Sequence, residues 1–356
     1  MGDLFDSQNG DFDIKKEHIN GKGDLVVTAG LTNNGILGKT DVKSKIFDEK
    51  TITIDMFGFP FYRNFKYKMV THARVFSLKP NFKISDRQGL FLANSLSFLN
   101  HLFGYENMCS WAKINEIRIK LPTTATGEID FEFMENYIAE LEAQRIAELE
   151  AYLLATGLSN YTLTKKEEIS LAQFNKNPMG GGKIWQRFEL GELFNHIKQG
   201  RRLKKSDQIA GNIPFVMAGT TNTGVVNYVS NPVATFPKNA ITVDIFGNTF
   251  YRNYNFGAGD DTGVYWNSKK NYSEKMMLFL ATTMSKAVEG KFSYGKKLRS
   301  SQSLNIKVKL PTTADGTPDY DYMQTFISAV QKLVIKEVVL YTDRKIKATR
   351  EVVEQN

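Results

Sequence analysis

Side chains able to carry out covalent or metal chemistry are few in this sequence and are not grouped. Its histidines and its single cysteine show no metal-binding spacing. The "GDD" at 259–261 is better interpreted as an isolated acidic turn than as a pair of metal ligands, and "MGGGK" at 179–183 lacks the spacing and the following Ser or Thr of a phosphate-binding loop. No Asn/Asp-Pro-Pro-Tyr/Phe element for amino-methyl transfer is present. We therefore predict that the chain is not an enzyme and holds no metal or cofactor. The residues concerned are His18, His72, His101, His196 and Cys109.

Charge is the stronger chemical signal. The formal net charge is +8, and residues 184–317 hold 18 Lys and Arg against 9 Asp and Glu. Residues 1–128 hold 17 against 14, whereas residues 129–158 hold 1 against 7. A basic domain surface is typical of proteins that bind phosphate groups. The alternative is that the charges only keep the surface solvated. This alternative would explain the small excess of residues 1–128, but it explains the larger excess of residues 184–317 less well.

The composition is that of an ordinary globular protein, with 42% hydrophobic and 24% charged residues among 356. No apolar run approaches the length of a membrane span, and the opening "MGDLFDSQNG" is too acidic for a secretory signal. A single cysteine fits a reducing cytoplasm, where Cys109 is expected to be a small core residue. We therefore expect a cytoplasmic protein of two or three domains with no membrane partner.

One element of the sequence occurs twice. Residues 51–64 read "TITIDMFGFPFYRN" and residues 240–253 read "AITVDIFGNTFYRN", with nine of the fourteen positions identical. The same offset of 189 residues relates "GDLF" to "GELF", "TAGLTNNG" to "MAGTTNTG" and "KLPTTATG" to "KLPTTADG". A fixed offset at several separated places indicates duplication of one unit. We expect two copies of one domain and a connector.

Each copy has the same order of predicted elements. Short β-like runs come first, and "TITID" and "AITVD" are predicted strands followed by a Phe-Gly that suits a tight turn, since glycine tolerates positive φ. A helical stretch follows at 87–103 in copy one and at 273–288 in copy two. A short strand ending in "KLP" closes each copy, because proline stops the ladder. The fold class is therefore predicted to be α+β, with two repeated α/β domains.

A long helix is predicted after each "LPTTA". Asp130 and Asp319 stand where an N-cap or first-turn acid belongs. The apolar positions of the second helix keep a 4-3-4-4-3 spacing up to Tyr341, which is coiled-coil spacing. Helices of similar length at equivalent positions are expected to pair as an antiparallel coiled coil with approximate two-fold symmetry. The predicted pairing residues are Met134, Ile138, Leu141, Leu149 and Leu153 in the first helix and Met323, Ile327, Val330, Val334 and Val338 in the second.

These patterns divide the chain into five parts. The two repeated domains cover 1–128 and 184–317, and the two long helices cover 129–158 and 318–356. Residues 159–183 form a linker whose triple glycine predicts a flexible joint. The copies differ at their start, since copy two opens with "KIWQRFELGELF" and copy one with "MGDLF". The first domain is expected to lack the opening strand or turn of its twin: either its N-terminus is truncated, or the C-terminal "REVVEQN" packs nearby and partly compensates.

The order of these motifs resembles the specificity (S) subunits of type I restriction–modification systems and the related specificity subunits of type IIB systems. The resemblance is carried by the two "GxLF…AGxTNxG…IT(I/V)D(M/I)FG…FYRN…KLPTTA" blocks and the long helix after each, and it covers nearly the whole chain. It implies two target-recognition domains that read a bipartite site in double-stranded DNA. A helix of about 26 residues spans roughly 39 Å, close to the roughly 34–36 Å of one DNA turn, so the helices would act as a ruler.

The resemblance also implies partners. DNA methyltransferase subunits, expected to be two, would dock on this chain and bind S-adenosylmethionine, and a restriction or translocase subunit is a further candidate. The assembled complex would be an adenine-N6 DNA methyltransferase and restriction endonuclease. The alternative is a truncated or decayed subunit that acts as a non-reading adaptor or inhibitor. The basic second copy and the intact duplication favour a reader.

The "FYRN" element suits a reader because arginine can pair bidentately with guanine and asparagine with adenine. The alternative is that both residues close the hairpin or contact phosphate, since residues identical in both copies are poor readers of different sequences. Specificity is then expected where the copies diverge, at 57–60 against 246–249 and at 66–74 against 255–263. The candidate DNA-binding residues of copy one are Arg63, Asn64, Lys66, Lys68, His72 and Arg74. Those of copy two are Arg201, Arg202, Lys204, Lys205, Asn222, Asn248, Thr249, Arg252, Asn253, Lys296, Lys297 and Arg299, among which the basic residues outside "FYRN" are the candidate phosphate contacts.

Overall fold

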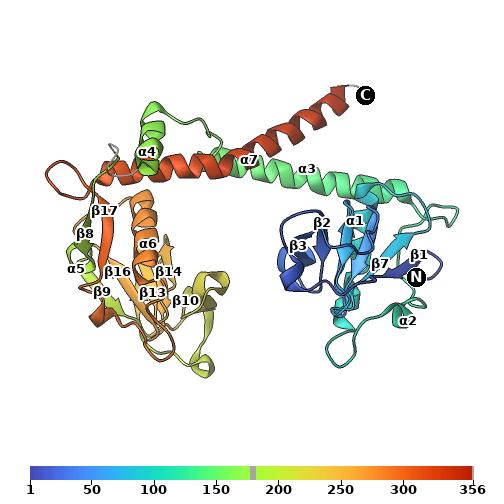
Figure 1. The fold of residues 1–356 in the computed structure, drawn as a ribbon, viewed down its shortest axis with the longest axis horizontal. Coiled ribbons are helices and arrows are strands. Elements are labelled where there is room, and N and C mark those ends of the chain that lie inside the picture. Colours follow the sequence, from blue (N-terminus) through green and yellow to red (C-terminus); the bar gives the residue numbers. More distant parts are fainter. Residues whose placement is uncertain (177–181, 355–356) are drawn as a thin grey trace. The chain divides into compact units, whose positions relative to one another are not determined.

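The computed structural model describes residues 1–176 and 182–354, with side chains as far as residue 348. The chain divides into two compact units, one formed by Met1–Ala151 with the residues from Lys345 onward and the other by Tyr152–Arg344 (Figure 1). Copy one of the repeat lies in the first unit and copy two in the second. The predicted triple-glycine joint lies largely outside the described residues. No helix in the described ranges is long and apolar enough to cross a membrane.

The first unit contains two sheets and a covering helix. The larger sheet has the order β1-β7-β4-β5 with antiparallel neighbours, and the smaller has the order β3-β2-β6 with β2 and β6 parallel. Helix α1 (Asp86–Ser95) packs against β4 and β5. The strands are β1 (Phe5–Asn9), β2 (Asp24–Val27), β3 (Ile36–Thr40), β4 (Thr51–Ile54), β5 (Pro60–Arg63), β6 (Tyr67–Met69) and β7 (Phe76–Pro80).

The second unit repeats this plan. Its sheet β9-β16-β13-β14 corresponds to β1-β7-β4-β5. Its sheet β11-β10-β15-β12 corresponds to β3-β2-β6 with β12 added at the edge, and it again has one parallel pair. Helix α6 (Glu274–Val288) covers β13 and β14 as α1 covers β4 and β5 (Figure 1). The α+β prediction and the duplication are therefore confirmed. The strands are β9 (His196–Gln199), β10 (Ala210–Val216), β11 (Val225–Val229), β12 (Thr235–Phe236), β13 (Ala240–Asp244), β14 (Thr249–Arg252), β15 (Phe256–Ala258) and β16 (Thr262–Trp266).

Each unit has a core between its larger sheet and its covering helix. In the first unit Ile52 of β4 and Leu92 of α1 are fully buried, and in the second unit Ile241 of β13 and Leu280 of α6 occupy the same layers. Because both faces of β4 and β13 are covered, these strands are buried at every position. Burial of this many β-branched and aliphatic side chains is the main source of stability in each domain.

The two copies also differ where each repeat begins and ends. In the second unit β17 (Lys307–Pro311) pairs antiparallel with β8 (Trp185–Glu189), which precedes the short helix α5 (Leu190–Leu193). In the first unit the counterpart of β17, residues 118–122, forms no strand, and no β8-like strand pairs with it within the described chain. The predicted "KLP" strand is therefore right for copy two and wrong for copy one, because a strand needs a hydrogen-bonding partner.

The two predicted long helices are present as α3 (Phe131–Ala155) and α7 (Tyr320–Glu354). Their N-caps are as expected, since Asp130 accepts a hydrogen bond from the Phe133 amide at 2.8 Å and Asp319 accepts one from the Tyr322 amide at 2.9 Å. The pairing of the helices with each other stays a prediction.

The residues of the predicted pairing stripe differ in exposure, and their pairing stays a prediction. Met134 and Met323 are buried in the cores of their own units, whereas Val334 is 72% exposed, Val338 37% and Leu141 38%. Further along α7 the buried residues are Ala329, Val339 and Thr342, of which Val339 lies on nearly the opposite side of the helix from Met323. The first turns of α7 pack on its own domain, and the later turns bury a different face. Ile138, Leu149, Ile327 and Val330 are half-buried, and Leu153 is buried.

The predicted linker contains a helix. Residues Lys165–Asn175 form α4, which Thr164 caps, and this helix packs on the first half of α7. Glu167 and Lys332 form an ion pair at 2.8 Å with both side chains nearly buried, and Phe174 contacts Phe326 with ring centroids 4.5 Å apart. Within the predicted linker 159–183, residues 165–175 are therefore a helix and not an extended connector, because Glu167 and Phe174 pack against α7.

Candidate nucleic-acid interface

A buried aspartate organises the repeated hairpin in both copies. Asp55 accepts main-chain hydrogen bonds from Phe57 and Phe59 at 2.9 and 3.0 Å, which close the Phe-Gly turn. Asp244 accepts the same bonds from Phe246 and Asn248 at 2.8 and 2.9 Å. The glycine of each turn has positive φ, as the sequence predicted.

The same aspartates hold a second loop beside the hairpin turn. The second oxygen of Asp55 accepts the Gly30 amide at 2.8 Å, and that of Asp244 accepts the Gly219 amide at 3.0 Å. These glycines belong to "AGLTNNG" and "AGTTNTG", so one carboxylate fixes two loops in each copy. We call this carboxylate, with the three main-chain amides that it binds, the aspartate hub. It was not predicted from the sequence, although the identical "ITxD" and "AGxTNxG" motifs at one offset were a signal for it.

The second loop of each copy has an uncommon backbone. Asn33 and Asn34 have φ of 50° and 51°, and Asn222 and Thr223 have φ of 47° and 52°. Consecutive non-glycine residues in this left-handed region are strained by about 1–3 kcal/mol each. Such strain is often found at binding sites. Asn222, a predicted DNA contact, is exposed here, although its amide nitrogen lies 3.3 Å from the Val225 carbonyl oxygen.

The two "FYRN" arginines are buried, so base reading by Arg63 and Arg252 is not supported. Their exposed fractions are 2% and 1%. Each Nε donates to a strand threonine, Arg63 to Thr53 at 2.9 Å and Arg252 to Thr242 at 3.1 Å. Burial lowers the pKa of Arg63 to about 10 and also lowers the pKa of Arg252. Both side chains point inward, away from solvent, and Arg252 also donates hydrogen bonds to Thr223 of the second loop.

Lys68 and His72 also differ from their predicted roles. Lys68 is buried, forms an ion pair with Asp24 at 3.3 Å and donates to the Val42 carbonyl oxygen at 2.7 Å, so it is not available to phosphate. The Nδ1 atom of His72 lies 2.5 Å from the Asp13 carboxylate, and this hydrogen bond lowers the pKa of Asp13. Asn64, Lys66, His72 and Arg74 are the exposed residues of the predicted copy-one set, and of these His72 is bonded to Asp13.

The divergent turn residues of copy two are occupied within the hairpin. The Asn248 side-chain amide donates to Asp244 at 2.8 Å, and the Thr249 hydroxyl donates to the Gly247 carbonyl oxygen at 3.0 Å. Both are half-buried, whereas Asn253 is exposed. Asn248 and Thr249 therefore shape the turn in this structure and leave Asn253 as the accessible polar group beside it.

The basic residues of copy two come together in space. The Gln199 side chain at the end of β9 accepts the Ser300 amide at 2.9 Å and donates to the Asp260 carbonyl oxygen at 3.0 Å, where Arg299 also donates at 2.8 Å. The Arg201 amide donates to Ala258 at 2.8 Å. Residues 199–201 and 299–300, which lead into two basic segments, thus lie together beside the turn at 258–262. We call the basic side chains of these two segments the basic cluster: Arg201, Arg202, Lys204, Lys205, Lys296, Lys297 and Arg299.

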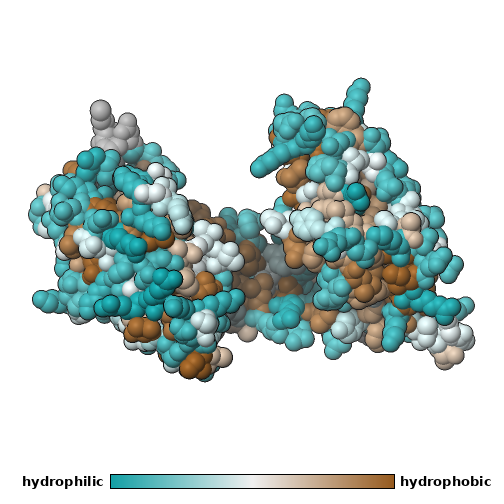
Figure 2. Space-filling view, turned by 90° about the horizontal axis from the view of Figure 1, so that it is seen from below, coloured by the Kyte–Doolittle hydropathy of each residue, from teal (hydrophilic) through white to brown (hydrophobic). Residues whose placement is uncertain are grey.

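The basic cluster is suited to contacting phosphate. Its members have no ion-pair partner in the described part of the chain, and all are exposed except Lys297, which is half-buried with its ammonium 4.5 Å from the centre of the exposed Tyr294 ring. Cationic side chains without a carboxylate partner are the usual source of phosphate affinity. The lower face of each unit is largely hydrophilic, with scattered hydrophobic patches (Figure 2).

Carboxylates near the basic cluster serve the fold. Asp261 of the "GDD" turn accepts the Ala218 amide at 3.0 Å, which agrees with its interpretation as a turn. Among the described residues no group of three or more His, Cys, Asp or Glu is arranged to hold a metal ion. Cys109 is buried in the core of the first unit, and burial raises the pKa of its thiol to about 12.

Comparison with known proteins agrees with this architecture. A family model described as the type I restriction modification DNA specificity domain matches residues 1–151 and 183–340, so it covers both copies. The type II restriction enzyme BgcI specificity subunit S.BcgI of Heyndrickxia coagulans is 27% identical over 345 residues, which is 94% of each chain.

A solved structure has the same fold. The S subunit of the type I restriction–modification system from M. genitalium superposes with a TM-score of 0.56 at 15% sequence identity, over 99% of this chain and 92% of that chain. Because the family model covers most of the sequence and both repeats, this chain belongs to the family of type I restriction–modification DNA specificity subunits, with two DNA specificity domains.

Proposed function

We propose that the two domains read the two halves of a bipartite site in double-stranded DNA on behalf of a restriction–modification complex. The observation that carries this proposal is the shared framework of aspartate hub, strained loop and buried arginine, which presents loops of different sequence in the two copies. A common framework with variable loops is how one fold is adapted to different targets. The domain limits proposed for the readers are 1–128 and 184–317.

The chain would act with DNA methyltransferase subunits. We propose that two of them dock on it and hold S-adenosylmethionine, and that a restriction or translocase subunit can join the complex. The names of the similar proteins, a type II specificity subunit and a type I S subunit, support a role as recognition component. Helices α3 and α7 would pair and set the distance between the two half-sites.

In the second domain the basic cluster would contact phosphates, and Asn222, Asn253 and the divergent loops would lie near base edges. In the first domain Asn64, Lys66 and Arg74 would take these roles. Phosphate contacts position a protein on the duplex, and base-edge contacts specify the sequence. The members of the basic cluster would therefore contribute affinity more than specificity.

A domain exchange tests this function. Residues 186–317 are replaced with the equivalent domain of a relative, and the methylated sites of cells carrying the chimaera and its methyltransferase are mapped by sequencing. We expect one half-site to change while the other half and the gap between them stay the same. The matched control replaces residues 1–128 instead and should change the opposite half. An exchange that altered both half-sites together would overturn the proposal.

A further inference from the structure

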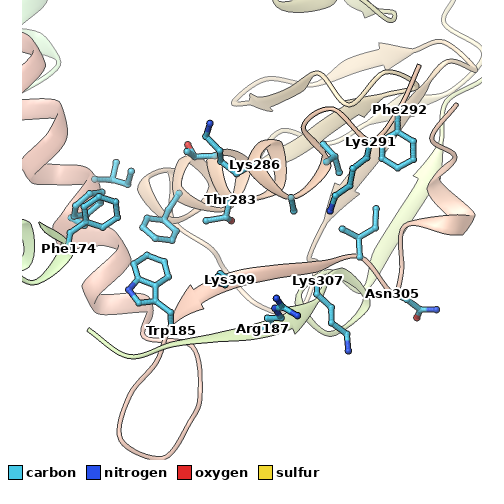
Figure 3. Close-up of a pocket in the computed structure, with 17 residues that line it drawn as sticks. Phe174, Trp185, Arg187, Thr283, Lys286, Lys291, Phe292, Asn305, Lys307 and Lys309 are labelled. Carbon is cyan, nitrogen blue, oxygen red and sulfur yellow. The ribbon is translucent and has the colours of Figure 1, made fainter. Parts of the chain in front are cut away.

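The second unit contains a groove of about 850 Å³ that the DNA-reading proposal does not use. It lies between α6 and the β8–β17 pair, with Phe174 of α4 and Phe326 of α7 at one end (Figure 3). None of the residues that line it belongs to the predicted DNA-binding set. The groove therefore lies on the side of the domain that the long helix and α4 border.

Aromatic side chains form the floor of the groove. Trp185 is stacked on Phe279 with ring centroids 6.1 Å apart, and Phe174 meets the edge of Trp185 at 6.0 Å. Figure 3 shows Trp185 and Phe174 together at the end of the groove near α7. Phe174 is 49% exposed, so an aromatic surface is left open. Such a surface fits one aromatic or large aliphatic side chain of a partner.

The rim of the groove is cationic. Five basic residues line it and no Asp or Glu does. Lys286 and Lys307 have exposed ion pairs with Glu289 at 3.0 Å and Glu189 at 3.4 Å, and such exposed pairs contribute little. The other three, Arg187, Lys291 and Lys309, have no ion-pair partner among the residues that the structure describes.

Two of these cations are direct neighbours. Arg187 of β8 lies opposite Lys309 of β17 in the antiparallel register, so both side chains leave the same face of the strand pair. Like charges directly opposite each other destabilise a strand pair. An anionic group placed between them would remove this repulsion.

We propose that the groove binds an acidic segment of the partner methyltransferase subunit. Carboxylates of this segment would lie between Arg187 and Lys309, and an apolar side chain next to them would rest on Trp185 and Phe174. The proposal rests on the proposed function for the existence of that partner. A protein segment fits better than the DNA backbone, because the backbone offers nothing apolar to the aromatic floor. The lining has five basic residues and no carboxylate, so its charge is complementary to that of an acidic segment.

The test is the affinity of the full chain for the purified methyltransferase subunit without DNA, measured by biolayer interferometry. The main variant is R187E, which replaces the repulsion with an attractive pair to Lys309. We expect R187E to keep or raise the melting temperature and to weaken methyltransferase binding at least tenfold. Phe174→Ala, which truncates a half-exposed ring, should weaken it as well.

A charge-matched control separates the groove from general electrostatics. The double variant R187E/K309E is compared with K238E/K269E, which changes the same charge at exposed positions of the same unit outside the groove and the basic cluster. Only the groove variant should lose the methyltransferase. Equal losses, or full affinity in R187E, would overturn the proposal.

Two further outcomes would also overturn it. If the groove variant lost DNA affinity more than the control did, the occupant would be nucleic acid. If it lost self-association in sedimentation while methyltransferase affinity stayed the same, the occupant would be a second copy of this chain. Because no DNA is present in the main assay, failure of the groove is distinguishable from failure of the two-reader function, which the domain exchange tests.

Discussion

The guanidinium of Arg252 donates two hydrogen bonds to Thr223, one to the carbonyl oxygen at 2.5 Å and one to the hydroxyl oxygen at 3.1 Å. Thr223 has a left-handed backbone, which a β-branched residue rarely adopts. Its counterpart in copy one is Asn34, a residue type that tolerates this conformation, and there the Nη2 atom of Arg63 has no hydrogen-bond partner among the described residues. In copy two, therefore, the hydrogen bonds from Arg252 stabilise the strained backbone of Thr223. In copy one the same position holds Asn34, which adopts a left-handed backbone more readily.

Replacing Arg252 with alanine should destabilise the second unit. The change leaves a cavity, removes the hydrogen bonds to Thr223 and takes away the donor that the buried Thr242 hydroxyl accepts from. We therefore expect a loss of about 3 kcal/mol or more in the free energy of unfolding. Urea unfolding of the full chain measures it. The control Arg202→Ala removes an exposed arginine and should stay within about 0.5 kcal/mol. A stable Arg252→Ala variant with altered site preference would restore the base-reading interpretation.

Removing two cations of the basic cluster should weaken DNA binding without changing its sequence preference. The variant Arg201→Ala/Lys205→Ala is expected to reduce the slope of log affinity against log salt by about one for each phosphate that is no longer neutralised. Fluorescence anisotropy over a salt series on specific and unrelated duplexes measures both quantities. The control Lys238→Ala/Lys269→Ala removes the same charge elsewhere. An unchanged slope would show that the basic cluster does not face DNA.

The buried face of α7 can be tested with two valines of the same helix. Val339 is 5% exposed, so Val339→Asp would bury a carboxylate without a partner and should cost about 2–5 kcal/mol. Val334→Asp at a 72% exposed site should have an effect below about 1 kcal/mol. Thermal unfolding compares the two. If Val334→Asp proved the more damaging, the pairing stripe predicted from the sequence would be right.

The ion pair between α4 and α7 should make stability depend on acidity. Burial alone would raise the pKa of Glu167, but hydrogen bonds from Lys332, Thr164 and Ser328 outweigh it and lower the pKa from 4.5 to about 2. Because the folded-state pKa is depressed, the contribution is complete above about pH 4.5 and is lost as the pH falls towards 2. The melting-temperature difference between wild type and Glu167→Gln should therefore be larger at pH 6 than at pH 3. A difference independent of pH would contradict this assignment.

The proposed ruler predicts a change in DNA spacing. Inserting four residues into α3 would lengthen it by about 6 Å, which corresponds to one or two base pairs at roughly 3.4 Å each. Methylation-site sequencing should find the same two half-sites with a wider gap. An active variant with the original gap would exclude α3 as the spacer.

Much of the fold could be predicted because it depends on local signals. The fixed offset located both copies, the Phe-Gly pairs identified the hairpin turns, and Asp130 and Asp319 marked the helix starts. A hairpin turn and a helix start each depend on residues that are neighbours in the sequence. The candidate site was harder, because the exposure of a side chain depends on what covers it.

Arg63 shows this limit most clearly. An arginine after a hairpin turn can face water or the core, and here other parts of the chain bury it. The same reason applies to Lys68, which becomes buried only because Asp24 and Val42 lie beside it. The 118–122 segment has a strand-like sequence, but within the described parts of the chain no strand pairs with it. Helix α7 buries different faces along its length. The apolar spacing of the sequence indicates one repeat for the whole helix and therefore does not predict this change.

The aspartate hub has a consequence for how such chains diversify. Asp244 holds both loops through the amides of Gly219, Phe246 and Asn248, and a main-chain amide is offered by any residue other than proline. Most loop side chains can therefore be exchanged without loss of the bonds that set the loop's path. New target sequences can then be acquired by point substitution or recombination at small cost to folding, and natural variants should accumulate changes in these loops faster than at the hub.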